Sequence, residues 1–199
     1  MEPFEGFELR YSWGMQPAYG ESYSPELLND FREKIPDSHV ILYRAVTNEE
    51  IPRIALEGIT LGVPTLNEHH EALALIFEQE RISVGIEGFS RNTVIYAELT
   101  PQGMTTSRSR GPILDVAIHP DNALVGNAEL YSEASMALYS HRSDHEVVRS
   151  IAREYWTSCF PLNQLSERMK NTDFSRMGDV FEVLIKEPIP VEYVRLHTN

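Results

Sequence analysis

An acidic residue, Glu182, interrupts a run of apolar, strand-forming residues near the C-terminal end of the sequence, from Val180 to Ile185. Such a run is typical of a strand covered on both faces. Because side chains alternate along a strand, we expect Glu182 to share one face with Val180 and Leu184, opposite Phe181. A carboxylate there costs several kcal/mol unless it is paired, hydrogen-bonded or facing a cleft. We therefore interpret Glu182 as a candidate catalytic residue.

A second isolated charge, Arg44, interrupts the apolar segment from His39 to Val46. Its guanidinium group offers a planar fork of donors that fits a phosphate or a carboxylate. Arg44 is therefore a candidate anion-binding residue. The structural alternative is a buried ion pair between Arg44 and Glu182, with no role in chemistry.

These two residues and two motifs between them resemble the ADP-ribosyltransferase superfamily. Leu-Tyr-Arg-Ala-Val around Arg44 is similar to the Arg-type opening strand of that family. A Thr-led turn at Thr65 and a Val-Ile-Tyr strand ending at Tyr96 follow. Phe-Glu-Val-Leu-Ile around Glu182, trailed by Pro-Ile-Pro, is similar to the closing strand of DNA- or RNA-directed toxins of the DarT kind. The resemblance covers about residues 39 to 196.

The resemblance implies an α+β fold, an ADP-ribosyltransferase-like split β-sandwich with flanking helices, as one domain over residues 1–199. It also implies NAD as the substrate. Glu182 would stabilise the oxocarbenium-like transition state in which the nicotinamide–ribose bond breaks, and Arg44 would bind the diphosphate. Thr65 would orient one of them, although it also fits as the cap of the following helix.

The resemblance further implies a site with stacking side chains and a macromolecular acceptor. Tyr96 and Tyr131, with Tyr139 as a third candidate, would stack on nicotinamide or adenine, or would be core aromatics. ADP-ribose would pass to a protein or nucleic acid, and the setting of a toxin or effector implies a partner or antitoxin protein. Val180 stands where enzymes that modify arginine or asparagine carry Glu or Gln, which argues against arginine as the acceptor.

Other motifs keep alternatives open. Thr105-Thr-Ser107 competes with Thr65 as the counterpart of the family's Ser-Thr-Ser motif. The RNA 2′-phosphotransferase branch uses a similar cleft, but its paired Arg-His opening is missing here. Fallback catalytic acids, which we expect to be exposed, are Glu98, Glu129 and Glu133.

The formal net charge of −13 argues against strong non-specific binding to nucleic acid. It also supports a second hypothesis, a non-catalytic acidic protein that binds a basic partner surface. The one cysteine, Cys159, excludes an internal disulfide and a Cys-based zinc site, and the spacing of the histidines does not favour a metal. With no apolar run near the ~20 residues of a membrane span and no secretory signal, we expect a cytoplasmic protein.

The elements that must position these residues are mixed helices and strands that do not strictly alternate, which favours α+β over a doubly wound sheet. Residues 1–38 are expected to form an N-terminal arm and a helix, from Ser24 to Lys34, packed on the core. Strands are predicted at residues 39–46, 93–99, 113–118, 180–185 and 191–196, the last as an extended piece or a turn of helix. One helix is predicted to open at a capping box, Thr47 to Glu50, with a start that Pro52 shifts later, and to stop at Gly58. Further helices are predicted at residues 65–80, 127–140, 143–156 and 164–169.

Overall fold

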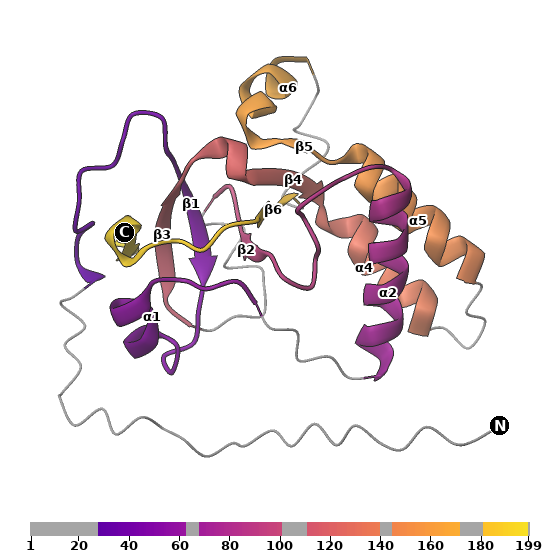
Figure 1. Ribbon diagram of the computed structural model, residues 1–199, viewed down its shortest axis with the longest axis horizontal. Helices are drawn as coiled ribbons and strands as arrows, with labels where there is room; N and C mark the ends of the chain where they lie inside the picture. The colour runs from indigo at the N-terminus through magenta and orange to yellow at the C-terminus, as the bar shows by residue number, and fades with distance from the viewer. Residues whose placement is uncertain (1–27, 63–67, 101–110, 140–144, 172–180, 199) are drawn as a thin grey trace.

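The computed structural model describes residues 28–62, 68–100, 111–139, 145–171 and 181–198 (Figure 1). Within these ranges the chain combines helices with two antiparallel sheets, which confirms the predicted mixed α and β class. The predicted N-terminal arm up to residue 27, Thr65 and the Thr105–Ser107 motif lie outside the described residues.

The strands are short, and most of them lie between helices. They are β1 Val40–Ala45, β2 Ile95–Ala97, β3 Ile113–Ile118, β4 Ala123–Asn127, β5 Phe160–Pro161, β6 Phe181–Ile185 and β7 Val194–Leu196. The α-helices are α1 Ile51–Glu57, α2 Glu68–Ser83, α4 Ala128–Tyr139, α5 His145–Ser158 and α6 Leu165–Asn171. Single turns of 3-10 helix precede β4, α6 and β7, at Pro120–Asn122, Leu162–Gln164 and Val191–Tyr193.

The two sheets meet at a single point along their edges. One sheet has the strand order β1-β3-β7, and the other has the order β2-β6-β4-β5. Edge strands β1 and β2 are joined by one bridge, in which the Tyr43 N–H donates to Glu98 O at 3.0 Å and the Glu98 N–H donates to Tyr43 O at 2.7 Å. The described parts of β1 and β2 pair with each other only at this bridge. Next to it, the two sheets are not joined by backbone pairing and can separate.

Two hydrophobic cores cover the larger sheet. The first contains buried side chains from both sheets and from α1, among them Leu42, Val116 and Val183. The second is formed by α2, α4 and α5, which pack together on the other face of the β2-β6-β4-β5 sheet (Figure 1). Along β6, Val183 and Ile185 enter the first core, whereas Leu184 enters the second. This alternation confirms that β6 is covered on both faces.

Local signals in the sequence explain where several elements begin and end. The Thr47 N–H donates to Glu50 Oε2 at 2.8 Å, as in a capping box, but α1 begins only at Ile51 because Pro52 has no N–H to donate and fits only the first turn. The strand expected at residues 39–46 is β1, and the strand expected at residues 113–118 coincides with β3.

Other expectations were wrong. The described part of the helix predicted from Ser24 to Lys34 is not α-helical, because the Arg32 N–H bonds to Glu192 O, at 3.1 Å, instead of a preceding carbonyl. Strands β4 and β5 were missed, being short and directly joined to helical turns. On α5, Val147 is 48% exposed, whereas Trp156 is buried.

The C-terminal end of α1 gives a prediction about packing. Gly58 has φ 76°, and a Cβ there would lie 2.2 Å from Ile189 O, in the bridge that joins Ile59 to Ile189. We expect Gly58→Ala to lower the free energy of unfolding by about 3 kcal/mol or more, because the bridge must move. Urea denaturation measures the change.

Gly85 provides the matched control. It has φ 78°, and an added Cβ would meet nothing within 4 Å. Gly85→Ala is expected to cost only the backbone strain, about 1 kcal/mol. Equal losses in the two variants would contradict the proposed close contact at Gly58.

Candidate functional site

Glu182 is held by an arginine that the sequence analysis did not identify. Both carboxylate oxygens of Glu182 accept hydrogen bonds from Arg91, through Nη1 to Oε1 and through Nη2 to Oε2 at 3.1 Å. The Tyr155 hydroxyl also donates to Glu182 Oε1, at 2.8 Å. The side chains of Arg91 and Glu182 are 8% and 13% exposed, so the pair is largely removed from water. Burial lowers the pKa of Arg91, but the Glu182 carboxylate, together with Tyr155 and Tyr96, outweighs burial and holds that pKa well above its ordinary value.

The Arg91 guanidinium lies among aromatic rings. Its central carbon is 3.7 Å from the ring centre of Tyr131, 4.9 Å from that of Tyr155, 5.0 Å from that of Tyr96 and 5.8 Å from that of Phe77. Such contacts favour a desolvated cation through the quadrupoles of the rings. Arg91 therefore links the segment before β2 to helices α2, α4 and α5 and, through Glu182, to β6.

A glycine on β4 leaves the space in which this cluster forms. Gly126 pairs with Glu182 across β4 and β6. A Cβ at residue 126 would lie 2.6 Å from the Tyr155 hydroxyl oxygen, so only glycine leaves the space through which that hydroxyl reaches Glu182. Burial raises the pKa of Tyr155 well above its ordinary value, which keeps the hydroxyl a donor.

Arg44 lies where the two sheets separate. Its Nη1 donates to Tyr96 O at 2.7 Å, so the side chain satisfies a carbonyl on the edge of β2 that β1 does not reach. Arg44 Nε is buried and has no hydrogen-bond partner among the described residues. Burial lowers the pKa of Arg44; Glu50 acts in the opposite direction, and Arg53 adds to the decrease.

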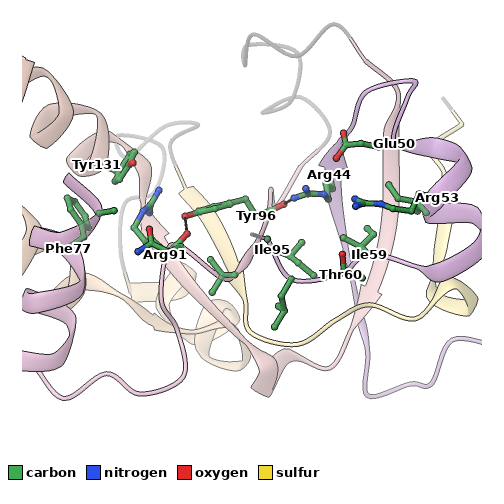
Figure 2. A pocket seen from close by; sticks show the side chains of 16 residues that line it. Arg44, Glu50, Arg53, Ile59, Thr60, Phe77, Arg91, Ile95, Tyr96 and Tyr131 are labelled. Atoms are coloured by element: carbon green, nitrogen blue, oxygen red, sulfur yellow. Dashed lines mark hydrogen bonds between the residues drawn. The ribbon is translucent and has the colours of Figure 1, made fainter. Parts of the chain in front are cut away.

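A cleft joins Arg44 to Glu182. One compartment, of about 440 Å³, is lined by both of these residues and by Arg91, Tyr96, Glu98 and Tyr131 among others. A second compartment, of about 530 Å³, shares Arg44, Arg91, Tyr96 and Tyr131 with the first and extends to Arg53 and Thr60. Figure 2 shows Tyr96 between the two arginines, with Arg91, Phe77 and Tyr131 at one end and Arg44, Glu50 and Arg53 at the other.

A second carboxylate, Glu98, lines the same compartment as Glu182. Burial, and then the negative charge of Glu182, raise the pKa of Glu98 to about 7. This carboxyl group therefore changes its charge near neutral pH, as a general acid or base does.

The predicted site residues are partly brought together. Glu182 and Arg44 line one cleft without pairing with each other, so the proposed ion pair between them does not form. Tyr96 and Tyr131 also line the cleft, and both contact Arg91. Thr65 lies outside the described residues.

The remaining candidates lie elsewhere or are only partly exposed. Tyr139 is 47% exposed and does not line either compartment, and the fallback acids Glu129 and Glu133 are exposed as expected. Glu98 is only half-buried, which corrects the expectation that it is exposed. Cys159 contacts the second core, and burial raises the pKa of its thiol to about 12, which makes the thiol a poor nucleophile at neutral pH.

Sequence reasoning missed Arg91, Glu98 as a cleft residue, and Arg53. The alternation of side chains along the strand could have predicted Glu98, because this residue stands two positions after Tyr96 and so falls on the same face. Arg91 had no periodic signal, since it lies in an irregular segment between α2 and β2. The one indication of Arg91 in the sequence was indirect: a buried Glu182 needs a cation as its partner.

Two further buried carboxylates lie outside the cleft. Glu80 is 4% exposed and contacts Arg149 and Arg153, while Asp115 is 3% exposed and contacts Arg195 and His197. Neither carboxylate lines the cleft compartments. Their pairing is explained by burial alone.

Comparison of the chain with models of protein families, with curated proteins and with solved structures found no match. Among the described residues there is no helix long and apolar enough to cross a bilayer. In the same ranges, no three His, Cys, Asp or Glu side chains are grouped so that they would hold a metal ion.

The Arg91–Glu182 pair gives a stability prediction. Arg91→Met leaves a buried carboxylate without its cation and is expected to cost about 3–5 kcal/mol of unfolding free energy. Adding Glu182→Gln removes the charge but keeps an acceptor for the Tyr155 hydroxyl. The double variant is therefore expected to be more stable than Arg91→Met, as measured by chemical denaturation.

Arg153→Met is the control for the Arg91 and Glu182 variants. Arg153 also pairs with a buried carboxylate, that of Glu80, but is itself 62% exposed. Its expected cost is about 1 kcal/mol or less. If the Arg91 and Glu182 substitutions were additive, the assigned pairing would be contradicted.

The raised pKa of Glu98 gives a prediction for pH. A carboxyl group whose pKa is higher in the folded than in the unfolded state contributes stability that is present below about pH 4.5 and is lost as the pH rises through about 7. Glu98→Gln should therefore gain about 1 kcal/mol relative to wild type between pH 5 and pH 8, a value reduced for partial solvent exposure. Thermal and urea unfolding at the two pH values measure the gain.

Glu133→Gln on the exposed face of α4 accounts for the general effect of removing one negative charge from an acidic protein. A gain in Glu98→Gln that is no larger than the gain in this control would show that Glu98 is not unusual.

Proposed function

We propose that the protein is an NAD-dependent ADP-ribosyltransferase that cleaves the nicotinamide–ribose bond and transfers ADP-ribose to a macromolecular acceptor. The observation that carries this proposal is the position of Arg44 on β1, Tyr96 on β2 and Glu182 on β6. They line one cleft where the two antiparallel sheets meet. The resemblance found in the sequence implies a first-strand Arg, a second-strand Ser, Thr or Tyr and a late-strand Glu around one NAD cleft. Tyr96, which lies on β2, fits the second of these.

The arginine end of the cleft suits a diphosphate. Arg44 keeps a buried Nε without a described partner, and Arg53 is close enough to lower the pKa of Arg44. Two guanidinium groups at one end of a cleft repel each other; Glu50 beside them opposes that repulsion, and an anion bound by both groups would add to its effect. An arginine fork also fits phosphate oxygens better than an ammonium group does.

The carboxylate end suits the ribose next to the bond that breaks. A carboxylate has about four acceptor positions, and Arg91 and Tyr155 use three on Glu182, so one remains for a ribose hydroxyl. Arg91 balances the charge of Glu182. We therefore assign the proposed role of Glu182 to its directed hydrogen bond with the ribose hydroxyl more than to a net negative charge. Preorganised acceptors in a site with little water stabilise developing positive charge.

Nicotinamide release from NAD tests the proposal. Glu182→Gln is expected to lower the rate about 10²-fold or more, because it weakens the acceptor for the ribose hydroxyl. Arg44→Lys, which loses the fork, is expected to weaken NAD binding about tenfold in calorimetry. Labelled NAD with a cell lysate then shows whether label passes to a protein or a nucleic acid.

Matched controls are Glu133→Gln on α4 and Arg168→Lys on α6, both exposed and away from the cleft. Each should behave like wild type. No NAD binding by the wild-type protein would contradict the proposal and would favour a non-catalytic acidic interaction protein.

A further inference from the structure

Glu98 stands at the junction of the two sheets, with its backbone fixed on both sides. Its N–H and C=O both bond to Tyr43 on β1, at 2.7 and 3.0 Å. Its side chain lines the compartment that Arg44 and Glu182 also line. The backbone bridge therefore holds a second carboxylate at a defined place in the cleft, directly after β2, which pairs with the strand that carries Glu182.

The surroundings of Glu98 differ from those of Glu182. Glu182 receives both terminal nitrogens of Arg91 and the Tyr155 hydroxyl. Glu98 faces the same cleft with the charge of Glu182 nearby, and both burial and that charge disfavour its ionised form. The other titratable or charged groups on this compartment are Arg44 from β1, Arg91 from the segment before β2, Tyr96 from β2 and Tyr131 from α4.

A pair of carboxylates in such different surroundings divides acid–base work between them. Arg91 and Tyr155 hold Glu182 in a fixed position, whereas Glu98 exchanges a proton near neutral pH. Such a group is suited to remove a proton from an attacking nucleophile.

Resting on the proposed function, we propose that Glu98 is the general base of the transfer step and that the acceptor attacks through an O–H or N–H group. As the bond from the acceptor O or N to ribose C1′ forms, the bond from C1′ to the nicotinamide nitrogen breaks. Its electron pair remains on nicotinamide, which leaves as a neutral molecule. The acceptor proton passes to the Glu98 carboxylate.

The charges of the cleft support this class of acceptor. A nucleophile that is already anionic, such as a carboxylate side chain, would be repelled by the ionised Glu98, because Arg91 balances only the charge of Glu182. A neutral hydroxyl or amide group is not repelled and needs a base, which Glu98 supplies.

The test compares two nucleophiles of different chemistry. With water as the acceptor, Glu98→Gln is expected to lower nicotinamide release about 10²-fold at pH 8, because water must lose a proton. Azide attacks without a proton to lose. Adding sodium azide should therefore restore nicotinamide release in Glu98→Gln and yield the ADP-ribosyl azide, whereas Glu182→Gln should not be restored.

The pH profile gives an independent reading. Wild-type hydrolysis should rise with pH and level off above about 7, whereas the residual rate of Glu98→Gln should lack this rise. A purely structural role for Glu98 would change neither the pH profile nor the response to azide. Calorimetry with NAD confirms that Glu98→Gln still binds its substrate.

The outcomes separate this inference from the function on which it rests. An active wild type with an equally active Glu98→Gln would overturn the role of Glu98 and leave the proposed function standing. Loss of activity in Glu98→Gln with NAD bound and no response to azide would also overturn it. A wild type that cleaves NAD with neither water, azide nor a cell lysate as the source of acceptor would remove the proposed function and this inference together.

Discussion

The buried pair of Arg91 and Glu182 is the interaction on which the organisation of the site depends. A carboxylate within an apolar strand is tolerated only with a partner, and here the partner is itself desolvated among four aromatic rings. The pair binds β6 to the segment before β2, and the rings bind both to the helical layer. Tyr155 adds a neutral donor, for which Gly126 leaves the space.

The cleft follows from a second constraint, the incomplete pairing of two sheets. Strands β1 and β2 share one bridge in the described chain, and next to it the Tyr96 carbonyl would lack a partner without the Arg44 side chain. Arg44 is thereby fixed where the two sheets separate, and its Nε has no hydrogen-bond partner among the described residues. The same opening brings Arg44 from β1, Glu98 directly after β2 and Glu182 from β6 to a common space.

The sequence predicted the strands of the site better than their partners. The lone charges Glu182 and Arg44 stood out against apolar neighbours, and both lie within the predicted strands. Arg91 could not be predicted, because its role comes from helices and a strand brought together only by the tertiary fold. Strand β4, which contributes Gly126, was missed because five residues joined directly to a helix carry little periodic signal. Glu98 was seen only as an exposed fallback, since its burial depends on the bridge to Tyr43.

A crystal structure with an NAD analogue that resists hydrolysis tests the central claim most directly. The account predicts the diphosphate within hydrogen-bonding distance of the Arg44 guanidinium and a ribose hydroxyl on the Glu182 carboxylate, with the Arg91 pair still in place. An analogue bound elsewhere, or an empty cleft at saturating concentration, would contradict it.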